Sequence, residues 1–443
     1  MNKSKCLFMR LVLIIGLIVQ CALLQASTLI DGLYYDLDTS NRTATVTYEV
    51  DGTGNYASLS ANVKIPENVV YNGVTFTVTK IGENTFSNCK VLESISIPGT
   101  VLQIGQNTGV SNLPFYNCTS LKSVRFEDGA SSLVLGSYYR DDRGYNGTGL
   151  FSFCPLEEVY IGRNITYIDG RYPFEKYPQY YGYSAFYNQP KLAKVTISST
   201  VTEIPSCFLK GCKALNKVSI QGQLIKIPSY SFDGCQLSVL TLSNSIEEIG
   251  DYAFQNNTTL TTASLGDNVK KIGKYAFSGC TNLSILNLGN SLVTIDDYAF
   301  QSIGSDANVG LNFEVPNTLS VIGKFAFYKS AVSSINIPNS VTTIGESCFA
   351  ENTKLEKVTL GNGCSELPKN VFSGCSLLSS VVLSNGLETI SDAAFFGCKV
   401  LESISIPGTV LQIGQNTGVS NLPFYNCTSL KSVRFEDGAS SLV

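Results

Sequence analysis

Histidine and tryptophan are both absent from this chain of 443 residues. Histidine is the side chain that most often acts as a general base and is the commonest zinc ligand, so its absence argues against acid–base catalysis and zinc binding. The missing tryptophan removes the largest aromatic platform for stacking sugars. We therefore expect no enzyme activity, no metal ion and no cofactor.

Charged residues are also scarce. They make up 15% of the chain and leave a net charge of −4 at pH 7. A protein that binds nucleic acid normally carries a basic surface, which this composition does not supply. Nucleic acid is therefore not an expected partner.

The first 26 residues have the pattern of a signal peptide. Three basic residues precede an apolar run from Leu11 to Leu24, and Ala26 is a small residue suited to cleavage. The run of about 14 residues is shorter than the roughly 20 that a membrane-spanning helix needs. This segment predicts export to the cell surface or medium, without a transmembrane segment in the chain. Lipidation of Cys21 is the alternative, which Gln20 directly before it disfavours.

Residues 27–77 have the pattern of short strands joined by turns. Apolar residues alternate from Leu33 to Leu37 and from Ala44 to Val50, with turn residues at 38–41 between them. A second hairpin is indicated by Asn72-Gly73, since Asn-Gly favours the positive φ angles of a type I′ turn. We expect this region to be an N-terminal β cap that covers the first core layer of the repeats that follow.

Residues 78–443 consist of about fourteen copies of one unit, usually 23 residues long. Its apolar positions fit neither a helical nor a strand period over their whole length, which is typical of a repeat solenoid. One column is Ile or Leu in every copy, with Ile168 in the fourth. A second column is Phe except in the fifth copy, which has Leu209 there and Phe208 one step earlier. The phenylalanines of this column are Phe86, Phe115, Phe151, Phe186, Phe232, Phe254, Phe277, Phe300, Phe327, Phe349, Phe372, Phe395 and Phe424.

The unit resembles the leucine-rich repeats of the BspA-like type. The stretch 269–288, VKKIGKYAFSGCTNLSILNL, and the stretch 341–349 closely fit the combination I-G-x-x-A-F-x-x-C with L-x-x-V-x-I-P. This resemblance implies a horseshoe-like leucine-rich repeat solenoid, mainly of short β-strands with turns and short helical turns. It further implies a secreted or surface-attached protein that binds host proteins or other cells, with no catalytic residues to carry over.

Nine of the 14 cysteines occupy a column three residues after the phenylalanine. Other copies have Gln189, Asn257, Ile303, Ser330 or Asn352 there. Asn, Gln and Ser share with Cys the ability to donate a hydrogen bond, so we expect buried free thiols that bond to loop carbonyls. Disulfides between neighbouring coils, which stack at about 4.8 Å, are the alternative. The column cysteines are Cys89, Cys118, Cys154, Cys212, Cys235, Cys280, Cys375, Cys398 and Cys427.

Insertions lengthen three adjacent copies, at residues 105–114, 136–150 and 169–185. All three begin at the same position of the repeat unit, so we expect the insertions to lie close together in space. Tyrosine is abundant in the second and third, and it offers a large contact area with a polar tip, which suits recognition surfaces. We predict that they form a ligand-binding site; the alternative is that the rings only order the loops. The candidate residues are Tyr138, Tyr139, Tyr145, Tyr172, Tyr177, Tyr180, Tyr181 and Tyr183.

The outward-facing residues of the predicted strands form a second candidate surface, small, polar and nearly uncharged. They are equally explained as good strand-forming surface. These residues are Ser96, Arg125, Tyr160, Thr196, Ser219, Thr241, Ser264, Asn287, Glu314, Asn336, Thr359, Val382, Ser405 and Arg434.

Residues 89–134 recur without change at 398–443. Physical constraint fixes the buried columns but not the surface positions between them, so the identity indicates recent duplication or an assembly of repetitive DNA. The second copy stops where the first continues, and no terminal cap follows, so we expect a chain truncated at its C-terminus.

Together these features predict an exported, non-enzymatic repeat protein that mediates adhesion through host or neighbouring-cell surface or matrix proteins. Two alternatives stay open: a surface module that captures carbohydrate, with tyrosines stacking on sugars, and a passive structural surface protein.

Overall fold

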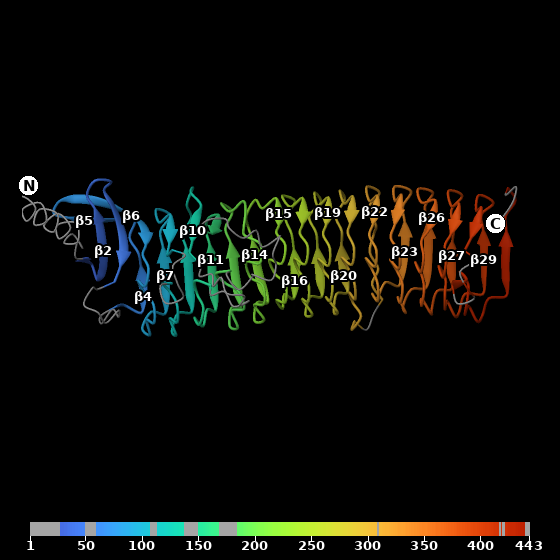
Figure 1. Cartoon of the computed structure of the whole chain (residues 1–443), viewed down its shortest axis with the longest axis horizontal. Helices are drawn as coiled ribbons and strands as arrows, with labels where there is room; N and C mark the ends of the chain where they lie inside the picture. The colour runs from blue at the N-terminus through green and yellow to red at the C-terminus, as the bar shows by residue number, and fades with distance from the viewer. Residues whose placement is uncertain are drawn as a thin grey trace, which may run out of the picture.

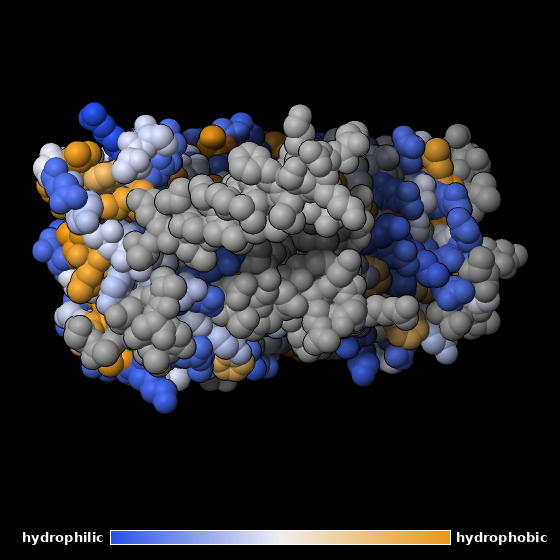
Figure 2. All heavy atoms as spheres, turned by 60° about the vertical axis from the view of Figure 1, so that its left-hand side comes forward, coloured by the Kyte–Doolittle hydropathy of each residue, from blue (hydrophilic) through white to orange (hydrophobic). Residues whose placement is uncertain are grey.

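The chain folds as an elongated solenoid whose coils follow one another along its longest axis (Figure 1). The computed structural model describes residues 27–48, 59–106, 113–136, 149–167, 184–307, 310–415, 418 and 421–438. Within them there are strands and turns and no α-helix. On the face that Figure 2 shows, apolar residues are scattered among polar ones. The predicted leucine-rich repeat solenoid with a β cap is confirmed.

The N-terminal cap is built from the two predicted hairpins. The first hairpin pairs β2 with β3 and places Asp38 opposite Thr43; the second pairs β5 with β6 across Asn72 and Gly73, whose φ angles of 50° and 77° are both positive. The third strand, β3, also pairs in parallel with β6 and so joins the cap to the first coil. The strands of this region are β1 (Thr28–Ile30), β2 (Leu33–Asp38), β3 (Thr43–Thr47), β4 (Asn62–Lys64), β5 (Asn68–Tyr71) and β6 (Val74–Ile81).

Most coils contribute one longer strand to a set of parallel sheets. Each residue pairs with its counterpart in the next coil, as Val124 does with Val159, so equivalent side chains stack. These strands are β7 (Ser94–Ile97), β9 (Ser123–Phe126), β11 (Glu158–Ile161), β13 (Lys194–Ile197), β14 (Lys217–Ile220), β16 (Val239–Thr241), β18 (Thr262–Ser264), β20 (Ile285–Asn287), β23 (Ser334–Ile337), β25 (Lys357–Leu360), β27 (Ser380–Val382), β29 (Ser403–Ile406) and β31 (Ser432–Phe435).

A second parallel ladder runs through the isoleucine column. The strand β10 pairs with β8 on one side and with β12 on the other. These short strands are β8 (Gln103–Ile104), β10 (Leu133–Leu135), β12 (Ile165–Tyr167), β15 (Lys226–Ile227), β17 (Glu248–Ile249), β19 (Lys271–Ile272), β21 (Thr294–Ile295), β22 (Val321–Ile322), β24 (Thr343–Ile344), β26 (Glu366–Leu367), β28 (Thr389–Ile390) and β30 (Gln412–Ile413).

The fourth member of this column was assigned wrongly from the sequence. The register places Tyr167 opposite Leu135, whereas Ile168, the residue predicted there, lies outside the described residues. The Tyr167 hydroxyl accepts a hydrogen bond from the Ala185 amide at 3.0 Å. This contact gives the polar end of the ring a partner, and burial raises the pKa of Tyr167 to about 12.

The phenylalanine column forms a nearly continuous stack of rings. It lies inside the turn that joins the short strand of each coil to the longer one. Successive rings lie 5.1–5.7 Å apart, as between Phe115 and Phe151 or between Phe349 and Phe372. The fifth copy interrupts the stack as its sequence suggested. Leu209 takes the backbone position of the column, bonding to Ser231, while the Phe208 ring meets Phe186 edge-on at 90°. The column therefore tolerates a change of sequence position as long as an aromatic ring fills the space.

Candidate functional site

The three insertions leave the solenoid from neighbouring positions. They follow β8, β10 and β12, which pair side by side. A Cβ atom on Gly136 would lie 2.7 Å from the Gln106 nitrogen, and one on Gly149 would lie 2.3 Å from the Ser184 oxygen. The described ends of the insertions are therefore packed against each other backbone to backbone.

The tyrosines of the predicted site lie outside the described residues. This holds for Tyr138, Tyr139, Tyr145, Tyr172, Tyr177, Tyr180, Tyr181 and Tyr183. The structure places the described ends of their loops together. That these tyrosines form a binding site stays a prediction.

The outward-facing positions of the long strands form a continuous row within each sheet, which we call the strand face. Ser96, Arg125 and Tyr160 pair in register, and the row continues through Thr196 and Ser219. Further along, Thr241, Ser264 and Asn287 form a second segment, Asn336, Thr359 and Val382 a third, and Ser405 and Arg434 a fourth. Glu314 is exposed but belongs to no strand.

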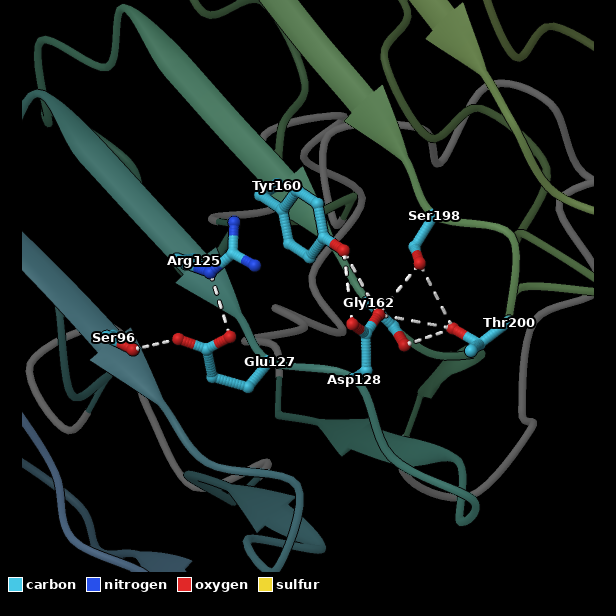
Figure 3. A network of polar contacts seen from close by, with 8 residues as sticks. All are labelled: Ser96, Arg125, Glu127, Asp128, Tyr160, Gly162, Ser198 and Thr200. Atoms are coloured by element: carbon cyan, nitrogen blue, oxygen red, sulfur yellow. Dashed lines mark hydrogen bonds and ion pairs between the residues drawn. The ribbon is translucent and has the colours of Figure 1, made fainter.

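A polar network fixes the strand face in the coils that carry the insertions (Figure 3). The Arg125 Nε donates to Glu127 Oε2 at 2.8 Å, and its guanidinium lies 3.6 Å from the centre of the Tyr160 ring. Burial alone would lower the pKa of Arg125, but the bond to Glu127 and the attraction of its charge raise it. Glu127 in turn accepts a bond from Ser96. One face of Tyr160 is thus covered, which holds the ring in a fixed orientation.

Asp128 completes this network from the loop after β9. Its carboxylate accepts hydrogen bonds from the hydroxyls of Tyr160 at 3.1 Å and Ser198 at 2.7 Å (Figure 3). The Thr200 hydroxyl bonds to both Asp128 and the Gly162 carbonyl. The carboxylates therefore act as acceptors that connect successive coils, and the network contains no activated nucleophile.

The cysteine column behaves as predicted. Eight of the nine thiols, all but that of Cys89, donate to the carbonyl of the column phenylalanine, or of Leu209, in the preceding coil. The S···O distances are 2.9–3.4 Å for Cys118, Cys154, Cys212, Cys235, Cys280, Cys375, Cys398 and Cys427. Gln189, Asn257, Ser330 and Asn352 make the same contact through an amide or hydroxyl. The column cysteines are free thiols in the structure.

The repeats match a known family model. The model of the "BspA type Leucine rich repeat region" matches residues 73–178, 179–305 and 310–431. The chain belongs to the BspA-type leucine-rich repeat family. No curated protein matches its sequence.

Solved structures similar to this BspA-type chain include a leucine-rich repeat protein from Bacteroides ovatus. It shares 23% identity over 94% of this chain and 90% of its own, with a TM-score of 0.50, and supports the fold. A leucine-rich cell surface protein from Faecalibacterium prausnitzii shares 25% identity over 94% and 95% of the two chains, with a TM-score of 0.38. The Treponema pallidum leucine-rich repeat protein shares 28% identity over 41% and 79%, with a TM-score of 0.31.

Neither a membrane-spanning helix nor a metal-binding cluster is found in the described residues. The described ranges include no helix long and apolar enough to cross a membrane. No group of three or more His, Cys, Asp or Glu residues suited to a metal ion occurs in the same ranges.

A stack of aromatic rings was missed by the sequence reasoning. Tyr230, Tyr252, Tyr275, Tyr298 and Phe325 lie face to face with centroids 4.5–4.9 Å apart. The sequence signal was an aromatic residue two places before the column phenylalanine in five successive copies. The rings cover one another's faces, and Lys210 lies over the outer side of Tyr230. The inner rings present only their edges, which makes them a poor platform for sugars.

The rings occupy a position where the backbone is left-handed in copies with and without an aromatic residue, as Asn84, Ser347 and Asn370 show with φ of 55–57°. All five aromatic residues of the stack have φ between 55° and 59°. For a bulky residue that left-handed conformation costs roughly 1–2 kcal/mol. Aromatic contacts contribute about 0.5–1.5 kcal/mol per pair, and an inner ring has two of them, so stacking can offset the strain.

Buried thiols should make the native protein resistant to thiol reagents and sensitive to alkali. Burial raises the pKa of Cys212 and of Cys280 to about 12. In the unfolded chain a thiol ionises near pH 8.5. Above that pH the unfolded state binds fewer protons than the native state, so the stabilisation from the neutral thiols is lost progressively up to about pH 12.

The measurement is the rate of modification by a thiol reagent at pH 8 together with urea unfolding from pH 7 to pH 11. We expect slow modification of the native chain, fast modification in denaturant, and a midpoint that falls above pH 9. Rapid modification of Cys280 in the native chain, found by mass mapping, would contradict this.

Proposed function

We propose that this BspA-type protein is exported and binds proteins on host or neighbouring cells through its tyrosine-rich insertions. Family membership supports a repeat scaffold with an exposed binding surface. The observation that carries the proposal is the packing of the insertion ends, where Gly136 meets Gln106 and Gly149 meets Ser184. Loops whose described ends lie against each other are suited to form one joint surface.

Hydrogen bonds between side chains hold together the coils that carry the insertions. The bonds that join Arg125, Glu127, Asp128 and Tyr160 lie in the same coils as the insertions. A surface that is held in place before binding loses less conformational entropy when the partner arrives. A strand face held rigid in these coils is therefore suited to protein recognition.

The proposed role is non-enzymatic. The chain has no histidine that could activate a cysteine. Burial raises the pKa of the thiols of Cys212 and Cys280, which keeps them protonated and donating to carbonyls, whereas a nucleophilic cysteine needs a lowered pKa. Export through residues 1–26 is part of the proposal, and sequencing the mature N-terminus distinguishes cleavage before Ser27 from lipidation at Cys21.

The test is binding of the chain from Ser27 to Val443 to immobilised host matrix proteins. Replacing Tyr138, Tyr139, Tyr180 and Tyr181 with serine should weaken binding at least tenfold, because the contact area of four rings is lost. A matched variant changes Tyr71 and Tyr425, which are 42% and 44% exposed outside the insertions, to serine and should bind as the unmodified chain does. Equal binding by all three proteins would exclude the insertions as the site.

A glycan array separates the carbohydrate alternative. A selective glycan signal that disappears with the four insertion tyrosines would favour carbohydrate capture at the insertions. Self-association without any soluble ligand would favour the passive structural role.

A further inference from the structure

A neutral polar pocket lies on the other half of the solenoid, at the ends of β23, β25 and β27. Its volume is about 440 Å³, and none of its lining residues is charged. Five asparagines line it, namely Asn317, Asn336, Asn339, Asn362 and Asn385. The pocket falls in the range of about 300–1,000 Å³ typical of small-molecule sites.

The asparagines are gathered by the repeat register. Asn336 belongs to the strand face and pairs with Thr359, which pairs with Val382. Asn339, Asn362 and Asn385 follow their strands at equivalent positions in successive coils. The stacking therefore brings amides from several coils to one wall, and Val382, which is exposed, adds an apolar patch beside them.

These amides differ from those at the same position closer to the N-terminus. There Asp267 accepts hydrogen bonds from both Asn244 and Asn290, at 3.5 and 2.8 Å, which occupies the amides of those coils. In the pocket the Asn339 Oδ1 accepts from the Asn362 backbone at 2.8 Å.

The remaining polar groups of the pocket are open to a ligand. Among the described residues, no protein group bonds to the side-chain amides of Asn317, Asn336 or Asn385. Ser384, which is 6% exposed and lines the pocket, has a hydroxyl without a hydrogen-bond partner within the same described ranges. A buried hydroxyl without a partner is unfavourable, so a ligand or water that reaches it gains a bond.

We propose that this pocket binds a neutral saccharide. An asparagine amide both donates and accepts, and a sugar hydroxyl does the same, so several amides on one wall match the rim of a sugar ring. The absence of charge from the lining disfavours phosphates, carboxylates and cations. Val382 and Pro338 offer apolar surface to the C–H groups of the ring. This proposal is independent of the tyrosine-rich insertions.

The experiment is a glycan array with the purified chain, followed by titration calorimetry with the neutral oligosaccharide that gives the strongest signal. Replacing both Asn336 and Asn385 with alanine should weaken binding at least tenfold. Neither side chain has a protein partner to lose, so folding should be unaffected. Val382→Arg, which fills the pocket and adds a charge, should abolish binding.

Two controls separate this site from the insertions. Thr241→Ala changes the equivalent strand-face position on β16 outside the pocket and should leave the affinity within twofold of the unmodified chain. The variant with four insertion tyrosines changed to serine should keep its saccharide binding. The proposal is overturned if no neutral saccharide binds, if the pocket variants bind normally, or if an uncharged peptide binds there in place of sugar.

Discussion

Replacing Phe126 with alanine should destabilise the solenoid by about 3–5 kcal/mol, whereas replacing Phe435 should cost less than about 1 kcal/mol. The two residues are equivalent positions of the duplicated segments 89–134 and 398–443, so their local sequences are identical. Any difference between the two variants reports the surroundings in the fold alone.

The surroundings differ because of the neighbouring coils. The strand β9 pairs with β7 on one side and β11 on the other, and the Phe126 ring meets Phe151 and Phe186 edge-on. Phe126 is completely buried. In the second copy β31 pairs with β29, and Phe435 is 56% exposed. Truncating the first ring leaves a cavity in the core, and truncating the second removes a side chain that water already reaches.

Urea unfolding and hydrogen exchange should be measured together for both variants. A repeat protein can unfold coil by coil, so a single free energy need not describe it. Exchange should rise throughout the coils around β9 in the Phe126 variant and only at the C-terminal coils in the Phe435 variant. Equal destabilisation by the two substitutions would show that the environment of β31 resembles that of β9.

The core could be predicted from the sequence because a solenoid stacks equivalent positions on each other. The phenylalanine and cysteine columns could be predicted directly, since the same residue type fills the same place in the core of each coil. The prediction was wrong at Tyr167, where the coil leads directly into an insertion and the register shifts by one residue.

The surface sites were harder to predict for the same physical reason. Packing constrains buried columns strongly, but an exposed residue is free to vary. The asparagine pocket depends on which of several stacked amides lack a partner, and the sequence does not distinguish the pocket amides from Asn244 and Asn290, which bond to Asp267. The aromatic stack did have a signal, in the residue two places before the column phenylalanine, but the face-to-face arrangement of the rings depends on the stacking of successive coils.

One regularity of the cysteine column emerges from sequence and structure together. In most copies two residues separate the column residue from the next buried leucine or valine, as between Cys280 and Leu283. In three coils only one residue separates them. In each case the next coil has Asn or Gln in the cysteine column. The short segments are 154–156, 235–237 and 330–332, and the amides are Gln189, Asn257 and Asn352.

Asn257 shows what an amide can add beside a short coil, whereas the amide oxygens of Gln189 and Asn352 have no hydrogen-bond partner among the described residues. Its Nδ2 donates to the Phe232 and Phe254 carbonyls at 2.8 and 2.9 Å. Its Oδ1 accepts from the buried Leu237 amide at 3.1 Å. A thiol could replace the bond to Phe232, as Cys280 shows with Phe254, but its sulfur is a weak acceptor for Leu237.

Asn257→Cys should therefore destabilise the protein by about 1–3 kcal/mol, although it restores the commonest residue of the column. Lengthening the short coil by one threonine between Gln236 and Leu237 should also be unfavourable alone, because the longer segment crowds Asn257. Combined, the two changes recreate the arrangement around Cys280, so the double variant should recover most of the loss. Urea unfolding of the four proteins gives the coupling energy directly.

Cys280→Ser supplies the control. Residue 280 follows a coil of full length, and serine keeps a hydrogen-bond donor there, as Ser330 does when it bonds to the Phe300 carbonyl at 2.7 Å. The substitution should therefore lower the free energy of unfolding by less than about 1 kcal/mol. Additive losses in the double variant would mean that coil length and column residue are independent. A coupling of at least about 1 kcal/mol would mean that Asn257 is favoured by the short segment before it, because its Oδ1 is the acceptor that the buried Leu237 N–H needs.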